Sequence, residues 1–375
     1  MTTVTAPAAV APPEAVPAIG ADEAAGALAE RMFGGVIATM EMLTVHLGWR
    51  FGFYEQLRTP HTAGELAAAT GILPRYVREW CEQQATAGFL DVDDPAVAPD
   101  ERHFVLPPGH AVALLDQDHP AYIGSVAALA GGIGVSFAAV LDAYRDGTGL
   151  SFGGYGDEVR IGQGLFNRAG FLGQLAETWV PGMPGVAELL GRPGAVALDL
   201  GCGVGWSTIA LARAFPNLTA VGIDSDEASI MDARRNAAGS DLTGRVRFEV
   251  ARSDSPAAPG SADVVCFFEA LHDMAHPVES LAAVRSSLRP GGVVVVVDEA
   301  AEEEFAPGGS EVERILAASS VLHCLPVGRS QPDSEATGAL FRPATMRSYA
   351  ARAGYSAVEV APIEHDLFRF YVLTP

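Results

Sequence analysis

The segment 197–208, which reads "ALDLGCGVGWST", constrains the fold more than any other part of the chain. Residues 196–200 form an apolar run typical of a buried parallel strand, and residues 207–215 are expected to form a helix. Three closely spaced glycines lie between them, so the backbone can approach a ligand without a Cβ in the way. A glycine-rich turn between a strand and a helix is where α/β folds hold a cofactor. The sequence therefore predicts an α/β domain with a cofactor site at this turn.

The spacing of the glycines indicates which cofactor is bound. A dinucleotide fingerprint would need a third glycine at the position of Trp206. The pattern is instead D-x-G-x-G-x-G, formed by Asp199, Gly201, Gly203 and Gly205. An acid at the end of the strand can meet a cationic group, directly or through water, and disfavours a pyrophosphate. The next strand ends at Asp224, which is placed to accept both hydroxyls of a ribose. We therefore expect an amino-acid-bearing nucleoside rather than a dinucleotide.

Alternating strands and helices fill the C-terminal half of the chain. Strands are predicted at 196–200, 220–224, 246–250, 263–268 and 293–298, with helices between them, and an antiparallel hairpin is predicted over 356–374. Five βα units followed by a hairpin predict an α/β fold with a doubly wound, Rossmann-like, seven-stranded sheet whose last strand is antiparallel.

A mostly helical pattern precedes this domain. Thr62 and Glu65 form a capping box at the start of one helix, Gly71 lies in a turn, and Pro74 is placed to open a second helix. Residues 88–93 and 102–109 follow as two strands of a wing. This order predicts a winged helix.

The charge balance argues against DNA as the partner of that winged helix. The net charge is −22, and all basic residues are arginine, so a Schiff-base lysine and a Walker lysine are both excluded. Residues 61–120 hold three arginines against ten acidic residues. Because a phosphate backbone requires cations, we expect no nucleic-acid partner and interpret the region as a scaffold or dimerisation module.

Four segments are predicted: a disordered Ala/Pro-rich tail (1–25), a winged-helix and dimerisation domain (26–120), a helical connector (121–190) and the α/β domain (191–375). The uncharged run 121–141 is Gly/Ala-rich and lacks basic flanks, which favours a buried helix over a membrane span. Four scattered cysteines, without CxxC spacing, indicate free thiols in the cytoplasm. Residues 27–57 have more apolar positions than one amphipathic stripe uses, which predicts a homodimer.

Four features of the chain resemble the class I S-adenosylmethionine (SAM) methyltransferases and occur in the same order along the sequence. They are the motifs "LDLGCGVG", "GIDSD" and "LRPGGVVVVVDE" and the terminal hairpin. The resemblance covers about 185 residues. It implies SAM as the cofactor, bound by the residues Asp199, Gly201, Gly203, Gly205, Asp224, Ser253 and Phe268. Arg252 stands where these enzymes often place an acid that meets the adenine amino group. Ser253, Asp254 or the backbone is expected to replace it.

The segment "CFFEALHDMAHP", residues 266–277, resembles the "L-H-D-W" segment of winged-helix O-methyltransferases. This resemblance implies that His272 is the general base for a phenol or another acidic hydroxyl, although Met274 stands in place of the tryptophan. Resemblance to actinobacterial winged-helix methyltransferases extends over most of the chain. It implies that the connector roofs a substrate pocket, with Tyr155 and Asn167 as acceptor contacts, and that the N-terminal helices pair two subunits.

Other interpretations remain open. His272 and His276 are spaced i, i+4, and together with His323 they could hold a metal that orients a keto acid for C-methylation. A SAM-sensing winged-helix regulator and a methyltransferase fold without methyl transfer are further alternatives. The main prediction is methyl transfer to a small, largely apolar, hydroxylated metabolite, with no bound metal and with His323 on the substrate side.

Overall fold

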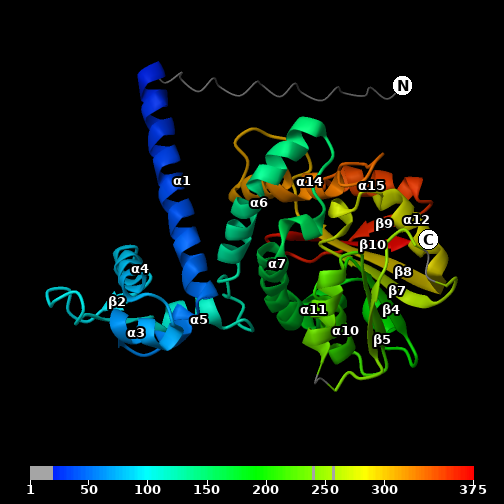
Figure 1. Cartoon of the computed structure of the whole chain (residues 1–375). Helices are drawn as coiled ribbons and strands as arrows, with labels where there is room; N and C mark the ends of the chain where they lie inside the picture. Colours follow the sequence, from blue (N-terminus) through cyan, green and yellow to red (C-terminus); the bar gives the residue numbers. More distant parts are fainter. Residues whose placement is uncertain (1–19, 239–240, 256–257) are drawn as a thin grey trace, which may run out of the picture. The chain divides into compact units, whose positions relative to one another are not determined.

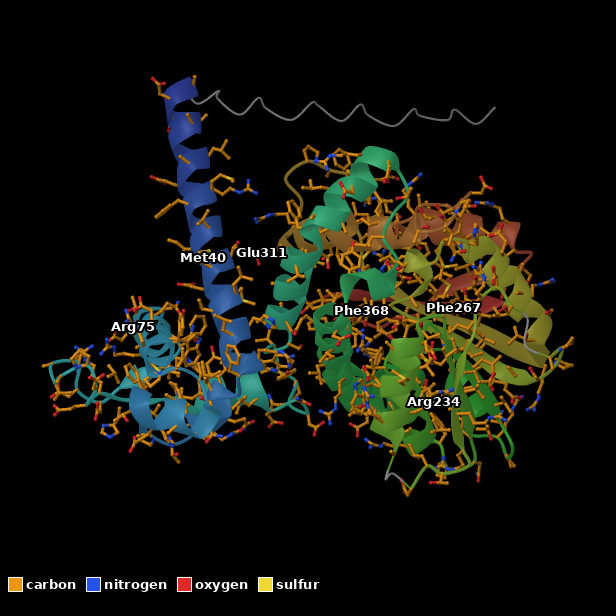
Figure 2. All side chains as sticks on the ribbon, in the orientation of Figure 1. Met40, Arg75, Arg234, Phe267, Glu311 and Phe368 are labelled. Carbon is orange, nitrogen blue, oxygen red and sulfur yellow. The ribbon has the colours of Figure 1, made fainter. Side chains whose placement is uncertain are left out.

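The computed structural model describes residues 20–238, 241–255 and 258–375 (Figure 1). The chain divides into two units, residues 1–42 and residues 43–375. Residues 1–19 of the predicted tail lie outside the described residues, and its last residues, from Ala21 on, belong to a helix instead of a disordered tail. In the first unit, helix α1 (Ala21–Arg50, which continues into the second unit) exposes large apolar side chains on several sides. These are Leu28, Met32, Phe33, Val36, Ile37 and Met40, the last of which is labelled in Figure 2.

The second unit begins with a small winged-helix region. Helices α3 (Ala63–Thr70) and α4 (Pro74–Thr86) are followed by the strands of the wing, and the three short strands β1 (His61–Thr62), β2 (Asp91–Val92) and β3 (His103–Val105) form a sheet of order β1-β3-β2. The predicted capping box is confirmed, because the Thr62 Oγ1 accepts the Glu65 N–H and the Glu65 carboxylate accepts the Thr62 N–H. Helices α2 (Phe53–Gln56) and α5 (Pro108–Leu115) complete the region.

The connector is helical and closely packed. Helix α6 (Val126–Asp146) lies against α7 (Asp157–Gly170) through glycines: a Cβ on Gly132 would be 2.6 Å from the Val159 side chain. By length and composition, α6 is the one described helix that could cross a membrane, and 39% of its most apolar window is buried. The remaining segments are η1 (Phe152–Tyr155), the π-helix η2 (Phe171–Trp179), α8 (Val180–Gly182) and α9 (Val186–Leu190).

The predicted seven-stranded sheet is present, with the order β6-β5-β4-β7-β8-β10-β9. Its strands are β4 (Val196–Leu200), β5 (Thr219–Asp224), β6 (Val246–Val250), β7 (Ala262–Phe268), β8 (Leu288–Glu299), β9 (Ala357–Val360) and β10 (Phe368–Thr374). β10 pairs antiparallel with both β8 and β9, whereas the pairs among β4 to β8 are parallel. The predicted fold class is therefore confirmed.

Both faces of the sheet are buried, because alternate side chains of each strand point to opposite sides. Ala197 belongs to one apolar cluster, with helices α10 (Trp206–Ala214) and α11 (Glu227–Ala237), whereas Leu198 belongs to the other, with α12 (Pro277–Ser287) and α15 (Pro343–Arg352). The other helical segments are η3 (Leu271–Asp273), α13 (Glu311–Ser319), the π-helix η4 (Ser320–Cys324) and α14 (Leu325–Gly328). Strand ends, η3 and η4 meet at one edge of the sheet.

Candidate functional site

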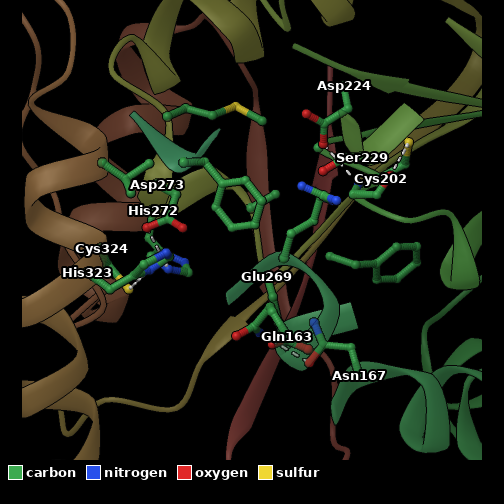
Figure 3. Close-up of a pocket in the computed structure, with 18 of the residues that line it drawn as sticks. Gln163, Asn167, Cys202, Asp224, Ser229, Glu269, His272, Asp273, His323 and Cys324 are labelled. Carbon is green, nitrogen blue, oxygen red and sulfur yellow. Dashed lines mark hydrogen bonds and ion pairs between the residues drawn. The ribbon is translucent and has the colours of Figure 1, made fainter. Parts of the chain in front are cut away.

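A cavity of about 580 Å³ lies at the carboxyl ends of the parallel strands (Figure 3). Its wall comes from the glycine loop after β4, the ends of β5, β7 and β8, and helices α7, η3 and η4. This is the position at which open α/β sheets bind ligands, and the volume suits a small-molecule site.

The glycine loop has the geometry that its spacing predicts. Gly201, Gly203 and Gly205 all have positive φ angles, of 73°, 51° and 86°. Gly201 and Gly203 line the cavity, whereas Gly205 lies behind it, where a Cβ would come within 2.7 Å of the Phe248 ring. Two of the glycines thus open the backbone to a ligand, and the third allows the loop to pack on the sheet.

Asp199 does not line the cavity. Its Oδ2 accepts hydrogen bonds from Ser207 Oγ (2.6 Å) and Thr208 Oγ1 (2.5 Å) at the start of α10, while its Oδ1 is buried without a hydrogen-bond partner. Burial raises the pKa of Asp199 to about 6. Direct contact with a ligand cation is therefore not part of this geometry, and Asp199 holds the loop and the helix together.

Asp224 ends β5 and does line the cavity. One carboxylate oxygen accepts the Gly203 N–H and the other accepts the Asp226 N–H, both at 2.8 Å. Burial raises the pKa of Asp224 despite these bonds. The fixed carboxylate retains lone pairs toward the cavity, as a ribose-binding acid requires.

Ser253 and Phe268 also line the cavity. The Ser253 hydroxyl is 2.8 Å from the Ser280 hydroxyl, and Phe268 ends β7. Arg252 forms a two-pronged ion pair with Asp254 and donates to Gln331 Oε1 at 2.7 Å. Its guanidinium is thus engaged by neighbouring side chains, and the Asp254 carboxylate is engaged with it.

His272 lies in η3, on the cavity wall opposite the glycine loop, and is 2% exposed. Its Nδ1 is 2.7 Å from Asp298 Oδ1 and 2.9 Å from Glu299 Oε2, at the end of β8. Its Nε2 is 3.2 Å from Asp273 Oδ1. Burial alone lowers the pKa of His272, but the carboxylates of Glu299, Asp273 and Asp298 raise it well above the ordinary value. The ring is therefore a strong base that is held in one orientation.

Two groups of possible metal donors occur among the described residues: His272 with Asp273 and Cys324, and His272 with Asp298 and Glu299. In each group the donor atoms lie within 4.8 Å of one another. His276 and His323, which the sequence suggested as further donors, belong to neither group, although both line the cavity. Burial lowers the pKa of His323, so its ring is neutral, and its Nε2 is buried without a hydrogen-bond partner.

The predicted acceptor contacts divide into two sets. Asn167 and His323 line the cavity. Tyr155 does not: its hydroxyl donates to the Leu322 carbonyl at 2.8 Å, and its ring packs on His323 with 4.6 Å between centroids. Tyr155 therefore positions His323 in this structure.

Sequence reasoning missed Asp298, Glu299, Cys324 and Glu269. A signal for the first two was present, because "VVVVVDE" places two acids at the end of the strand next to β7. Parallel neighbours end at one edge of the sheet, so these acids had to lie near the residues that follow β7.

Comparison with known proteins agrees with this architecture. A family model described as "Methyltransferase domain" matches residues 192–336, and a model described as "Rv2258c-like winged HTH domain" matches residues 38–115. The trans-aconitate 2-methyltransferase of Deinococcus radiodurans is 37% identical over 105 residues, which are 28% of this chain and 38% of that protein. The chain spans only 26–38% of the length of this and two further curated relatives.

Longer matches exist at lower identity. A ubiquinone biosynthesis O-methyltransferase of Cupriavidus pinatubonensis is 26% identical over 207 residues, which are 52% of this chain and 72% of that protein. The structure of the mitomycin 7-O-methyltransferase matches with a TM-score of 0.69 at 22% identity, over 94% of this chain and 99% of that chain. An O-methyltransferase from neocarzinostatin biosynthesis matches with a TM-score of 0.60 at 18% identity, over 89% and 95%. The two solved structures share the fold.

A seven-stranded sheet with one antiparallel strand and a glycine-loop cavity defines the class I methyltransferase fold. The regions that match the methyltransferase-domain and winged-HTH models, residues 192–336 and 38–115, fall on the seven-stranded-sheet region and on the winged-helix region of this fold.

Proposed function

We propose that the protein is a SAM-dependent O-methyltransferase that acts on a small, largely apolar, hydroxylated metabolite. The observation that carries this proposal is the position of a buried, acid-oriented histidine, His272, in the same cavity as the glycine loop and Asp224. Several similar proteins are O-methyltransferases, including one whose structure was solved with S-adenosylhomocysteine (SAH) and a dihydroxynaphthoic acid. The test is methyl transfer from radiolabelled SAM to a panel of phenols, with SAH release as the second readout.

The residues around the glycine loop fit this cofactor. Asp224 offers a fixed carboxylate to a ribose, and the Cβ-free backbone at Gly201 and Gly203 leaves room beside it. Phe268 supplies an apolar wall, and the Ser253 hydroxyl lines the same cavity. Bound SAM would supply an electrophilic methyl group on a sulfonium sulfur.

His272 would prepare the acceptor. Asp298 accepts from Nδ1, which leaves Nε2 free to remove the acceptor's hydroxyl proton. The resulting imidazolium would lie beside Asp273 Oδ1, which has no hydrogen-bond partner and is 3.2 Å from Nε2. The apolar side chains Leu129, Ile133, Phe152, Phe166 and Phe171 line the cavity and would exclude water around an apolar acceptor.

Cofactor binding is expected to depend on Asp224. The Asp224→Ala variant should lose about 1.5–3 kcal/mol of SAH binding, the range for hydrogen bonds to a charged group. Calorimetry with SAH measures this loss. Glu227→Ala, which removes an exposed acid from the neighbouring helix, is the matched control and should bind normally. Wild-type affinity in Asp224→Ala would remove this residue from the cofactor site.

A second candidate function is metal-assisted C-methylation of a keto acid. The observation that favours it is the cluster of His272, Asp273 and Cys324 donor atoms in the cavity wall, beside the unpartnered Nε2 of His323. A metal there would polarise a keto oxygen and promote enolisation. Metal analysis of the purified protein, followed by chelation and restoration with Fe²⁺ or Zn²⁺, tests this function. O-methylation by the base predicts insensitivity to chelator.

We also propose that the protein is a cytoplasmic homodimer, paired through the apolar surface of α1. Light scattering at micromolar concentration should give twice the 39.0 kDa mass of the chain. Phe33→Glu combined with Met40→Glu should give the monomer mass, because charges would replace exposed apolar side chains. A monomer mass for the wild type would contradict the proposal.

Regulation through DNA is disfavoured by the ion pairs of the winged-helix region. Arg75, which is labelled in Figure 2, pairs with Glu79, and Arg78 pairs with Asp100. Arg102 pairs with Glu82. Since these are the three arginines of residues 61–120, little positive charge is left for a phosphate backbone.

A further inference from the structure

Glu269 is an acidic cavity residue that the proposed mechanism leaves without a role (Figure 3). It directly follows β7 and adopts a φ angle of +51°, which residues other than glycine rarely adopt. Its N–H donates to the Val297 carbonyl at 2.7 Å, which fixes this conformation. Unfavourable backbone conformations of this kind concentrate at ligand sites.

The Glu269 carboxyl has no cationic partner of its own. Asn167, on α7, donates a hydrogen bond to it, and Gln163 in turn donates to Asn167 at 3.3 Å. The ion pairs of the described residues do not include Glu269. A carboxylate that is removed from bulk water without a counter-charge is unfavourable, so a ligand cation would stabilise it.

The charges around Glu269 strengthen its need for a cationic ligand. Asp273 from η3 and Asp298 from β8 face the same region, and the positive charge of His272 is already shared among three other carboxylates. Burial, reinforced by the two aspartates, raises the pKa of Glu269 to about 8. The surroundings therefore supply negative charge in excess of positive charge.

The order of the strands shows what part of a ligand would reach Glu269. β4 lies between β5 and β7, so Asp224, the glycine loop and Glu269 follow one another along the edge of the sheet. Ala270, the next residue, contacts the loop so closely that a Cβ on Gly201 would be 2.5 Å from its Cβ. A ligand with its ribose at Asp224 that crosses the glycine loop therefore extends toward Glu269. In SAM the end opposite the adenosine is an amino acid with an α-ammonium group.

We propose that Glu269 binds an ammonium group, and that this group is the α-ammonium of the cofactor's methionine part. The proposal rests on SAM being the cofactor, as proposed above. An amino group on the acceptor is the other source of the same chemistry.

Two variants separate the effect of losing the Glu269 carboxylate from any effect on the backbone conformation of this residue. Glu269→Gln keeps the shape of the side chain, and Glu269→Gly suits the positive φ angle and protects the fold. By calorimetry, both should bind SAH about 10- to 100-fold more weakly, the loss of one charge-assisted hydrogen bond. Methylthioadenosine, which lacks the amino-acid part, should bind wild type and variants with the same affinity. Thermal unfolding of the variants with methylthioadenosine bound confirms that they are folded.

A second pair of probes tests whether the acceptor is the source of the ammonium group. Wild type and Glu269→Gln, both saturated with SAH, are titrated with tyramine and with 4-ethylphenol, which differ by the amino group. Unchanged SAH binding together with loss of a wild-type preference for tyramine would assign the ammonium to the acceptor and overturn the cofactor assignment. Unchanged binding of all probes would overturn the proposal entirely. If wild type binds neither SAH nor methylthioadenosine, the proposed function itself fails.

Discussion

The His272→Ala variant is expected to bind SAH with nearly wild-type affinity and to lose turnover by about 10²–10⁴-fold, the usual contribution of positioned proton transfer. Binding should persist because the glycine loop and Asp224 are untouched. Turnover should fall because, among the described residues, no other histidine ring lies on Asp298. Single-turnover methyl transfer with pre-bound SAM measures the chemical step directly.

The loss of turnover in His272→Ala should shrink at high pH, where an acidic phenol ionises without a base. His272→Gln is a second variant, because alanine leaves Asp273, Asp298 and Glu299 without their shared positive charge. His276→Ala is the matched control, since this histidine lines the cavity but belongs to neither donor group. Full activity in both His272 variants, with a chelator-insensitive wild type, would contradict both the base and the metal mechanism.

The fold was largely predictable because its signals are local. Five apolar runs separated by helix-forming segments define the parallel strands, and the glycine loop marks the edge at which the site lies. Thr62 with Glu65 and Pro74 similarly predicted the helix starts of the winged-helix region. Two boundaries differed clearly. β8 begins at Leu288, five residues before the predicted strand, since Ala262 of β7 pairs with Leu288 across an irregularity. The wing strands, predicted over 88–93 and 102–109, are shorter, Asp91–Val92 and His103–Val105, because helix α5 already begins at Pro108.

The site was less predictable because its contacts join distant segments. The residue His272 followed from its motif, but its partner Asp298 lies 26 positions away on another strand. Asp199 was expected to meet a ligand cation directly or through water, and the hydroxyls of Ser207 and Thr208 hold it behind the loop, out of direct contact. Glu269 follows the predicted strand 263–268 and so had a signal for its place at this edge of the sheet, but neither its backbone conformation nor its lack of an ion-pair partner can be inferred from residue type.

Removal of Asp298, the acid that orients His272, is expected to give the second large effect on turnover. The Asp298→Asn variant should lower kcat by about 10²-fold or more, because Asp298 Oδ1 fixes the ring through Nδ1 and thereby selects the tautomer with Nε2 free. Asp298 is fully buried and also accepts the Glu299 N–H at 3.0 Å. Folding should be checked by SAH binding and by the thermal midpoint.

The pH profile separates this role from a structural one. His272 is active as a base only when deprotonated, and nearby carboxylates raise its pKa well above 6.5, so wild-type turnover should fall as the pH drops through that raised value. Removing the Asp298 charge lowers the pKa of His272, and the acid limb of the profile should therefore move to lower pH. Glu299→Gln is the comparison variant: Glu299 Oε2 lies 2.9 Å from the same Nδ1, but burial raises the pKa of Glu299 whereas His272 helps to lower that of Asp298, so Glu299 holds its proton more firmly than Asp298 does. Equal losses in both variants, with no movement of the acid limb in Asp298→Asn, would show that Asp298 supports the fold rather than the base.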